Sequence, residues 1–128
     1  MKDLDINLYS AGGVEDYYIP VPCRGVVKEF SVVANATMVA TGTIILARST
    51  TAVNTATAPT GDTAAGVLLE GVPDTTNKDL VFDPDSSTVA NTKIKVSFDT
   101  TILGGAANVL LMIKYDDSAS VAQAAKEA

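Results

Sequence analysis

The sequence predicts an all-β protein that folds as a single antiparallel β-sandwich. The chain has 128 residues, of which 47% are hydrophobic, and this length suits one domain with one core. Thr and Val occur fifteen times each and Ile seven times, and such β-branched residues fit a pleated sheet better than a helix. Turn-forming Gly, Pro, Asn and Asp separate short apolar segments, a spacing typical of sandwiches and barrels.

Residues 1–16 are expected to form a flexible N-terminal arm. Leu4, Ile6 and Leu8 alternate with polar residues and therefore share one face of an extended segment, which a break at residues 10–13 ends. A one-sided apolar strip of this kind suits addition to the sheet edge of another molecule. The alternative, which the sequence leaves open, is that this segment is the first strand of the domain's own sheet.

The sandwich is expected to span residues 17–116, followed by an Ala-rich tail at 117–128 that is helical or disordered. Residues 17–21 are expected to form a short strand at a sheet edge or a strand end, because Pro20 and Pro22 cannot donate to a neighbouring strand. A polar loop is expected at 48–63, and turns at 73–79 and 83–87. The other expected strands are 25–34, 37–47, 66–72, 80–82, 93–98 and 107–115.

The last expected strand is apolar on both faces. Val109, Leu111 and Ile113 share one face, and Leu110 and Met112 share the other. Because one face of an antiparallel sheet normally meets water, the outer face needs a loop, a terminal segment or a neighbouring subunit to cover it. We therefore expect a homo-oligomer, a trimer in preference to a dimer.

Residues that usually carry chemistry are scarce. His is absent, there is one Cys, and the net charge is −6. These counts argue against His-based catalysis, zinc sites built on Cys and a basic surface for nucleic acid. The sequence has no run of eighteen apolar residues, so no helix that crosses a membrane is expected. We expect a protein that is not an enzyme and has no cofactor.

The remaining candidate sites have plainer interpretations. The pairs Glu15-Asp16 and Asp116-Asp117 are interpreted as solubilising charge at strand ends. Residues 83–85 begin like a calcium loop, but Ile94 stands where that loop needs Glu, so Asp-rich turns are the preferred interpretation. Cys23 beside Arg24 is interpreted as a small buried hydrophobic residue. Tyr9, Tyr17 and Tyr18 are interpreted as interface residues in preference to a sugar platform.

Several segments resemble small head decoration (cement) proteins of tailed phages. They are residues 18–27, with the pattern Val-Pro-x-x-Gly at 21–25, residues 31–34 and residues 41–46, while residues 105–113 are similar to the last strand of those proteins. The resemblance implies a jelly-roll-like sandwich without catalysis. It also implies an oligomer on the capsid surface of the virion, made in the host cytoplasm and bound to the phage major capsid protein.

On this hypothesis the chain stabilises the shell across the boundaries between major capsid proteins. The candidate capsid or subunit interface residues are Leu4, Ile6, Leu8, Tyr9, Tyr17, Tyr18, Leu110 and Met112. The alternative hypothesis is a glycan- or receptor-binding module of a fibre or surface structure, with the polar 48–63 segment as its recognition surface. A third hypothesis, an enzyme, would rest on Asp116 and Asp117.

Overall fold

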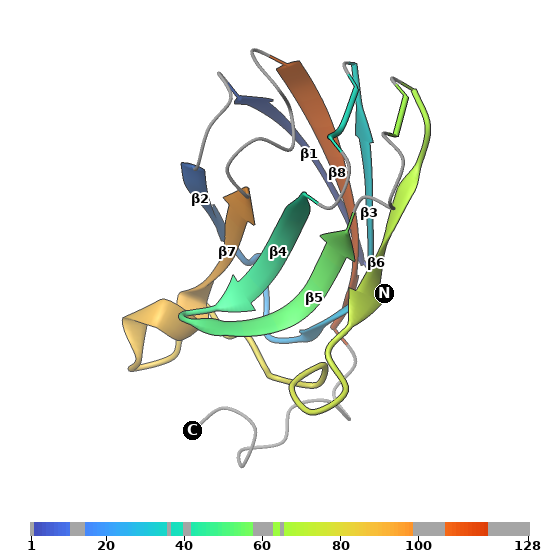
Figure 1. The fold of residues 1–128 in the computed structure, drawn as a ribbon. Helices are drawn as coiled ribbons and strands as arrows, with labels where there is room; N and C mark the ends of the chain where they lie inside the picture. Colours follow the sequence, from blue (N-terminus) through green and yellow to red (C-terminus); the bar gives the residue numbers. More distant parts are fainter. Residues whose placement is uncertain are drawn as a thin grey trace.

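The computed structural model describes residues 2–10, 15–35, 37–39, 42–57, 63–64, 66–98 and 107–117. Over these residues the protein is all-β, as predicted, and eight strands form one antiparallel sheet that curls into a half-barrel (Figure 1). A short 3-10 turn, η1 (Val89–Thr92), precedes β7. The strands are β1 (Lys2–Ser10), β2 (Glu15–Pro20), β3 (Val26–Ala34), β4 (Thr43–Arg48), β5 (Thr51–Thr57), β6 (Leu69–Pro73), β7 (Lys93–Phe98) and β8 (Ala107–Asp116).

The strand pairings describe one long hairpin that is rolled up on itself. Each strand pairs with its counterpart counted from the other end of the chain: β1 with β8, β2 with β7, β3 with β6 and β4 with β5. The tip of the hairpin is the turn between β4 and β5, where Ser49 has a positive φ of 58°. Three further pairings, β3 with β8, β4 with β7 and β5 with β6, close the roll. The resulting order is β1-β8-β3-β6-β5-β4-β7-β2.

The curl follows from the two edge strands, which are consecutive in the sequence. Ser10 ends β1 and Glu15 begins β2, and five peptide steps reach at most about 18 Å. The opposite edges of the sheet must therefore approach one another at this end. Figure 1 shows β1, β8, β3 and β6 on one side of the half-barrel, with β2, β7, β4 and β5 on the other.

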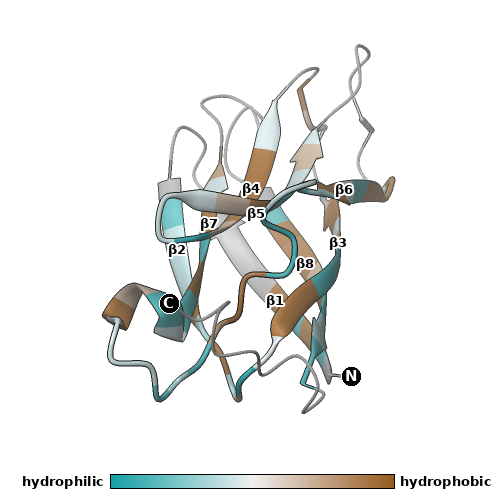
Figure 2. Ribbon diagram, turned by 90° about the horizontal axis from the view of Figure 1, so that it is seen from below, coloured by the Kyte–Doolittle hydropathy of each residue, from teal (hydrophilic) through white to brown (hydrophobic). Residues whose placement is uncertain are grey.

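The core lies inside the curl and draws on both halves of the sheet (Figure 2). The expected alternation of β7 is confirmed, because Ile94, Val96 and Phe98 are at most 1% exposed. In β8, the predicted inward face is also confirmed, because Val109, Leu111 and Ile113 are at most 1% exposed. The edge position of the segment around Tyr17 is also confirmed, since β2 is the last strand in the order.

The expected free arm is wrong for residues 2–10. β1 pairs with β8 over nine residue pairs, and Leu4 and Ile6 pack against the core cluster. The physical reason is that β8 would otherwise present a long edge of unpaired N–H and C=O groups. The own-strand alternative therefore describes this segment. β1 lies beside β8 in the sheet, so it does not cover the outer face of β8.

The expected loop at 48–63 is wrong over its first half, where β5 forms. β5 contains a bulge. Leu46 pairs with Asn54, and the next residue, Ala47, pairs with Ala52. Val53 therefore has no opposite residue. Val53 and Asn54 are consequently both buried, and the alternation that signals a strand is lost.

Other strand boundaries also differ from those expected. Among the described residues of the strand expected at 37–47, β4 begins at Thr43, and Met38 instead forms an isolated bridge with Thr63. The expected strand at 80–82 is reduced to a bridge between Phe82 and Gly25, and the one expected at 66–72 starts later, as β6. Residues 118–128, which hold most of the expected tail, lie outside the described residues.

Candidate functional site

The most distinctive surface is the outer face of β1, β8, β3 and β6, called the outer face below. β8 lies in the interior of this half of the sheet, and its outward residues Leu110 and Met112 remain partly exposed. Leu68, just before β6, is 49% exposed and lines the same face as Met112. An apolar strip on the outside of a sheet is a feature typical of contact surfaces.

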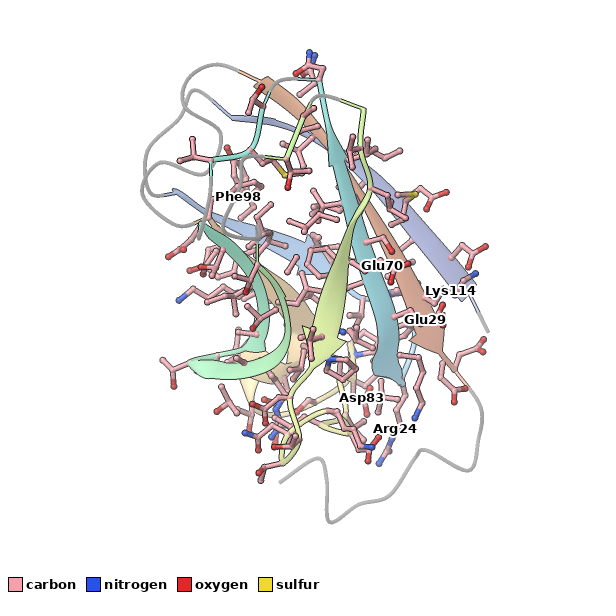
Figure 3. The ribbon with its side chains drawn as sticks, turned by 45° about the vertical axis from the view of Figure 1, so that its right-hand side comes forward. Arg24, Glu29, Glu70, Asp83, Phe98 and Lys114 are labelled. Atoms are coloured by element: carbon pink, nitrogen blue, oxygen red, sulfur yellow. The ribbon has the colours of Figure 1, made fainter. Side chains whose placement is uncertain are left out.

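The register of the four strands surrounds this strip with carboxylates. Asp5, Met112, Ser31 and Glu70 are consecutive neighbours across the sheet. In the adjacent row, Lys114 lies between Asp3 and Glu29. Figure 3 shows Glu29, Glu70 and Lys114 together on this side of the molecule. This part of the outer face therefore carries four acidic residues and one lysine, Lys114. The acidic residues are Asp3, Asp5, Glu29 and Glu70.

A groove of about 320 Å³ lies in this surface and is called the outer-face groove. Lys114 Nζ lies 3.2 Å from Asp3 Oδ1, so an ion pair occupies one side of it. The groove thus combines an apolar floor with an excess of negative charge. It is lined by Asp3, Asp5, Glu29, Ser31, Leu68, Met112, Ile113 and Lys114.

A second cavity, called the split pocket, opens where β6 leaves β3 and joins β5. β6 pairs with β3 at Leu69 and Glu70 but with β5 from Gly71 to Pro73. The gap that results has a volume of about 350 Å³. It is lined by Lys28, Glu29, Phe30, Ser31, Asn54, Glu70, Gly71 and Pro73. Glu29 and Ser31 border both cavities, so the two are neighbours on one surface.

Asn54 gives the split pocket a buried polar group. Its side chain is 1% exposed, and within the described part of the chain its Oδ1 atom accepts no hydrogen bond. Gly71 makes room for this amide, because a Cβ at residue 71 would overlap Asn54 Oδ1 and lie 2.9 Å from Phe30 Cδ2. An unsatisfied buried acceptor costs about 1–3 kcal/mol.

The acidic turns at the other end of the molecule are satisfied by their own backbone. Asp83 Oδ1 accepts from the N–H of Asp85 at 2.9 Å, and Asp74 Oδ2 accepts from the N–H groups of Thr76 and Asn77. Arg24 Nη1 lies 3.6 Å from Asp83 Oδ2. These contacts agree with the turn interpretation of the Asp-rich segments. Among the described residues, no group of three His, Cys, Asp or Glu is placed to hold a metal.

The sequence-predicted interface residues do not form one surface. Leu4 and Ile6 face the core, and Tyr17 packs its ring edge-on against Phe98 at 5.7 Å between centroids. Tyr18 is 56% exposed on β2, with Lys93 Nζ 5.3 Å from its ring centroid. Leu110 and Met112 lie on the other half of the sheet. The side chains of Leu8 and Tyr9 lie outside the described residues.

Other expected sites are found near strand ends. Lys95 Nζ lies 3.7 Å from Asp16 Oδ2, across β2 and β7. Cys23 is partly buried and packs against the core. Sequence reasoning missed Glu29, Glu70 and Asn54, because a strand pairing between distant segments brings them together. The sequence offered one signal: Lys28 and Glu29 are adjacent charged residues, which breaks the alternation of β3 at its register shift.

Comparisons of this chain with protein-family models, with curated proteins and with solved structures find no match. Within the residues that the structure describes, no helix is long and apolar enough to cross a membrane.

Proposed function

We propose that this chain is a structural virion protein that binds the outer surface of a phage capsid as a homo-oligomer. It stabilises the shell by contacting major capsid proteins on both sides of a boundary. Binding only the assembled lattice favours that state by linkage, and attachment of several subunits at once strengthens weak individual contacts. We further propose a trimer in preference to a dimer.

The strand order supports a jelly-roll-like sandwich as the finer description of the fold. β1-β8-β3-β6 and β5-β4-β7-β2 are the two runs of four that a rolled eight-stranded hairpin produces. Jelly rolls recur in viral capsid proteins and in lectins. Fold alone does not define function, so the proposal depends on the surface that this fold presents.

The observation that carries the proposal is the row across the outer face, in which Met112 lies between acidic and polar neighbours. A partner that covers Met112 and Leu68 buries apolar area, and the surrounding carboxylates select a partner surface with Lys or Arg. Enzyme-like clefts need convergent polar groups in an apolar pocket. A shallow face with alternating apolar and acidic residues is better suited to a protein surface.

Co-sedimentation with DNA-free heads of the phage that encodes the chain tests this proposal. Met112→Lys places a positive charge in the centre of the outer face and should reduce binding at least tenfold. Val89→Lys is the matched control, because Val89 is 68% exposed in η1, outside this face. Light scattering of the free protein should give the mass of a trimer.

Two results contradict the proposal. The first is that the wild-type protein does not co-sediment with the DNA-free heads. The second is that Met112→Lys and Val89→Lys bind equally well while both remain folded. A monomeric mass at micromolar concentration contradicts the oligomer alone.

A glycan- or receptor-binding module is the second candidate. The expected recognition loop at 48–63 no longer supports it, because residues 51–57 form β5. The exposed ring of Tyr18 supports it instead, since aromatic faces on an edge strand are able to stack on sugars. A glycan array with wild type and Tyr18→Ala distinguishes the candidates: a sugar signal that Tyr18→Ala abolishes favours the module.

A further inference from the structure

We infer that the free edge of β1, called the β1 edge below, binds an extended segment of a partner protein in which Lys or Arg alternates with apolar residues. The segment adds a further strand to the sheet, on the side of β1 that faces away from β8. This inference rests on the proposed function for the source of the segment, which is the major capsid protein. The chemistry of the segment follows from β1 alone.

The first argument is that β1 leaves one side of its backbone unpaired. β1 is the first strand in the sheet order, and among the described strands it pairs only with β8, over nine residue pairs. Alternate residues of an antiparallel edge strand direct their N–H and C=O groups away from the neighbouring strand. Such an edge accepts an incoming strand through main-chain hydrogen bonds.

The opposite edge of the sheet is less suited to this role. β2 has six residues and ends at Pro20, which has no N–H to donate to an added strand. β1 has nine residues and contains no proline. Proteins protect their sheet edges with proline or with charged side chains, and β1 carries charge, at Asp3 and Asp5 among others. A partner strand with the matching charge is therefore accepted at the β1 edge.

The second argument is the alternation of β1, which specifies the side chains of the added strand. Asp3 and Asp5 are exposed on the outer face, whereas Leu4 and Ile6 pack against the core and remain partly exposed. Residues opposite one another in neighbouring strands share a face of the sheet. An added strand therefore places apolar side chains beside Leu4 and Ile6, and places the alternate side chains beside Asp3 and Asp5.

The third argument is the charge that these alternate side chains meet. Lys114 Nζ lies 3.2 Å from Asp3 Oδ1, so the row of Asp3 already holds one cation. In the adjacent row the neighbour of Asp5 on β8 is Met112, and Asp5 forms no ion pair with a described residue. Opposite charges on neighbouring strands attract and like charges repel. Lys or Arg is therefore favoured opposite Asp5, and Glu or Asp is disfavoured.

The same alternation argues against a second copy of this chain as the occupant. In a second β1 that keeps Leu4 and Ile6 inward, the residues opposite Asp3 and Asp5 are odd-numbered, and no odd-numbered position of β1 is basic. β2 contains no Lys or Arg at all. Neither edge strand of this protein supplies the required cations, so the segment comes from a different protein.

Titration of the full-length protein with a peptide, followed by ¹H–¹⁵N NMR, tests the inference. The probe is acetyl-Thr-Lys-Val-Lys-Val-Thr-amide, and the matched control peptide has Glu in place of both Lys. The Lys peptide should give saturable shifts that are largest along β1. It should bind at least about fivefold more tightly than the Glu peptide, the scale of two exposed charge pairs.

Two methylated forms of the Lys peptide test the main-chain hydrogen bonds. One is methylated at the backbone nitrogens of both Lys residues, and the other at those of both Val residues. Alternate residues of a strand donate to the same neighbour, so at least one of the two peptides should lose binding. Unchanged binding of both methylated peptides contradicts strand addition.

Protein variants assign the charge. Asp5→Lys should weaken the Lys peptide and strengthen the Glu peptide, each roughly two- to tenfold. Asp85→Lys is the matched control, because it makes the same change in net charge at an exposed turn outside the outer face. It should leave both affinities within about twofold of wild type, since salt screens remote charges. Equal effects of Asp5→Lys and Asp85→Lys overturn the inference.

Three further results also overturn it. The first is the absence of saturable binding, or equal binding of the Lys and Glu peptides. The second is that the largest shifts fall at Leu110 and Met112, which would place the peptide across the outer face. The third is an oligomer of the free protein that Asp5→Lys dissociates, which would assign the β1 edge to a second copy.

Co-sedimentation with DNA-free heads separates this inference from the proposed function. If the heads bind the wild type and the peptide does not, the capsid proposal stands and this inference fails. If the peptide binds along β1 and the heads do not bind, the β1 edge site stands and the capsid proposal fails. If both bind, Asp5→Lys should also reduce co-sedimentation, and an unchanged value overturns the assignment of the segment to the major capsid protein.

Discussion

The hydroxyl of Tyr115 donates a hydrogen bond to the backbone carbonyl of Cys23 at 2.6 Å, although the two residues are far apart in the sequence. The carbonyl of Phe82 lies 3.3 Å from the same hydroxyl as a second acceptor. The Tyr115 side chain is fully buried. One phenol therefore joins the end of β8 to the segment before β3 and to the bridge at Phe82.

Tyr115→Phe should lower the free energy of unfolding by about 1–2 kcal/mol, because it removes the donor to the Cys23 carbonyl. The Phe82 carbonyl keeps its hydrogen bond from the N–H of Gly25 at 2.9 Å. Urea unfolding followed by circular dichroism measures the loss. Tyr18→Phe is the matched control, since Tyr18 is 56% exposed, and it should change stability by less than about 0.5 kcal/mol. Equal effects of the two substitutions would falsify the role given to Tyr115.

Tyr115 should also make stability depend on pH in the alkaline range. Burial raises the pKa of its phenol above the ordinary value of about 10, and the charges of Cys23, Asp83 and Asp117 raise this pKa further. Because the folded state prefers the neutral phenol, this stabilisation is complete below about pH 10. It is lost as the pH rises from the unfolded-state pKa toward the folded-state pKa.

The measurement is the free energy of unfolding from pH 8 to pH 11 for the wild type and Tyr115→Phe. The wild type should lose stability more steeply above about pH 10. The difference between the two curves isolates Tyr115 from the lysines and the other tyrosines. Parallel curves over this range would contradict the prediction.

Gly71→Ala should destabilise the fold by about 1–3 kcal/mol, the usual range for overpacking. Its Cβ would collide with Asn54 Oδ1 and come within 2.9 Å of the Phe30 ring. Shortening the amide in the double variant Gly71→Ala with Asn54→Ser should recover part of the loss. A double-mutant cycle measures this coupling. Strictly additive effects would show that Gly71 and Asn54 do not interact.

Removal of residues 1–9 should destabilise the domain by at least about 3 kcal/mol, because Leu4 and Ile6 lose their contacts with the core. The truncation also leaves the β8 edge unpaired, so aggregation should increase. Thermal unfolding and light scattering monitor the two effects. A truncated protein that is as stable as the wild type would restore the interpretation of this segment as a free arm.

Sequence periodicity predicted β7 and also β3, which was expected at 25–34, but it missed β5. β7 alternates without a break, and its inward residues were identified. β3 has a register shift between Val27 and Glu29, so Val26 and Val27 are both buried while Lys28 and Glu29 are both exposed. β3 was predicted despite this shift, because Phe30 and Val32 alternate regularly beyond it. The bulge at Val53 instead lies inside the short strand β5, and that strand was not predicted. Each bulge shifts the two-residue period by one position, which a search for local alternation does not detect.

The candidate surfaces were only partly accessible to sequence reasoning. The two apolar faces of β8 pointed to Leu110 and Met112, which lie on the outer face. Nothing local marked Asn54 as special, because its burial depends on the bulge in β5 and on a glycine in β6. The acidic rim was likewise hidden, since Asp3, Glu29 and Glu70 come from three strands that are distant in the sequence.

The amino-acid sequence by itself determined the all-β class, the edge position of β2 and the inward face of β7 and β8. These properties depend on side-chain alternation and on proline, which act over a few residues. Only the tertiary structure decided that β1 joins β8, that the chain rolls up as one hairpin and that carboxylates surround Met112. The reason is that register between distant strands is set by long-range hydrogen bonding and by closure of the core.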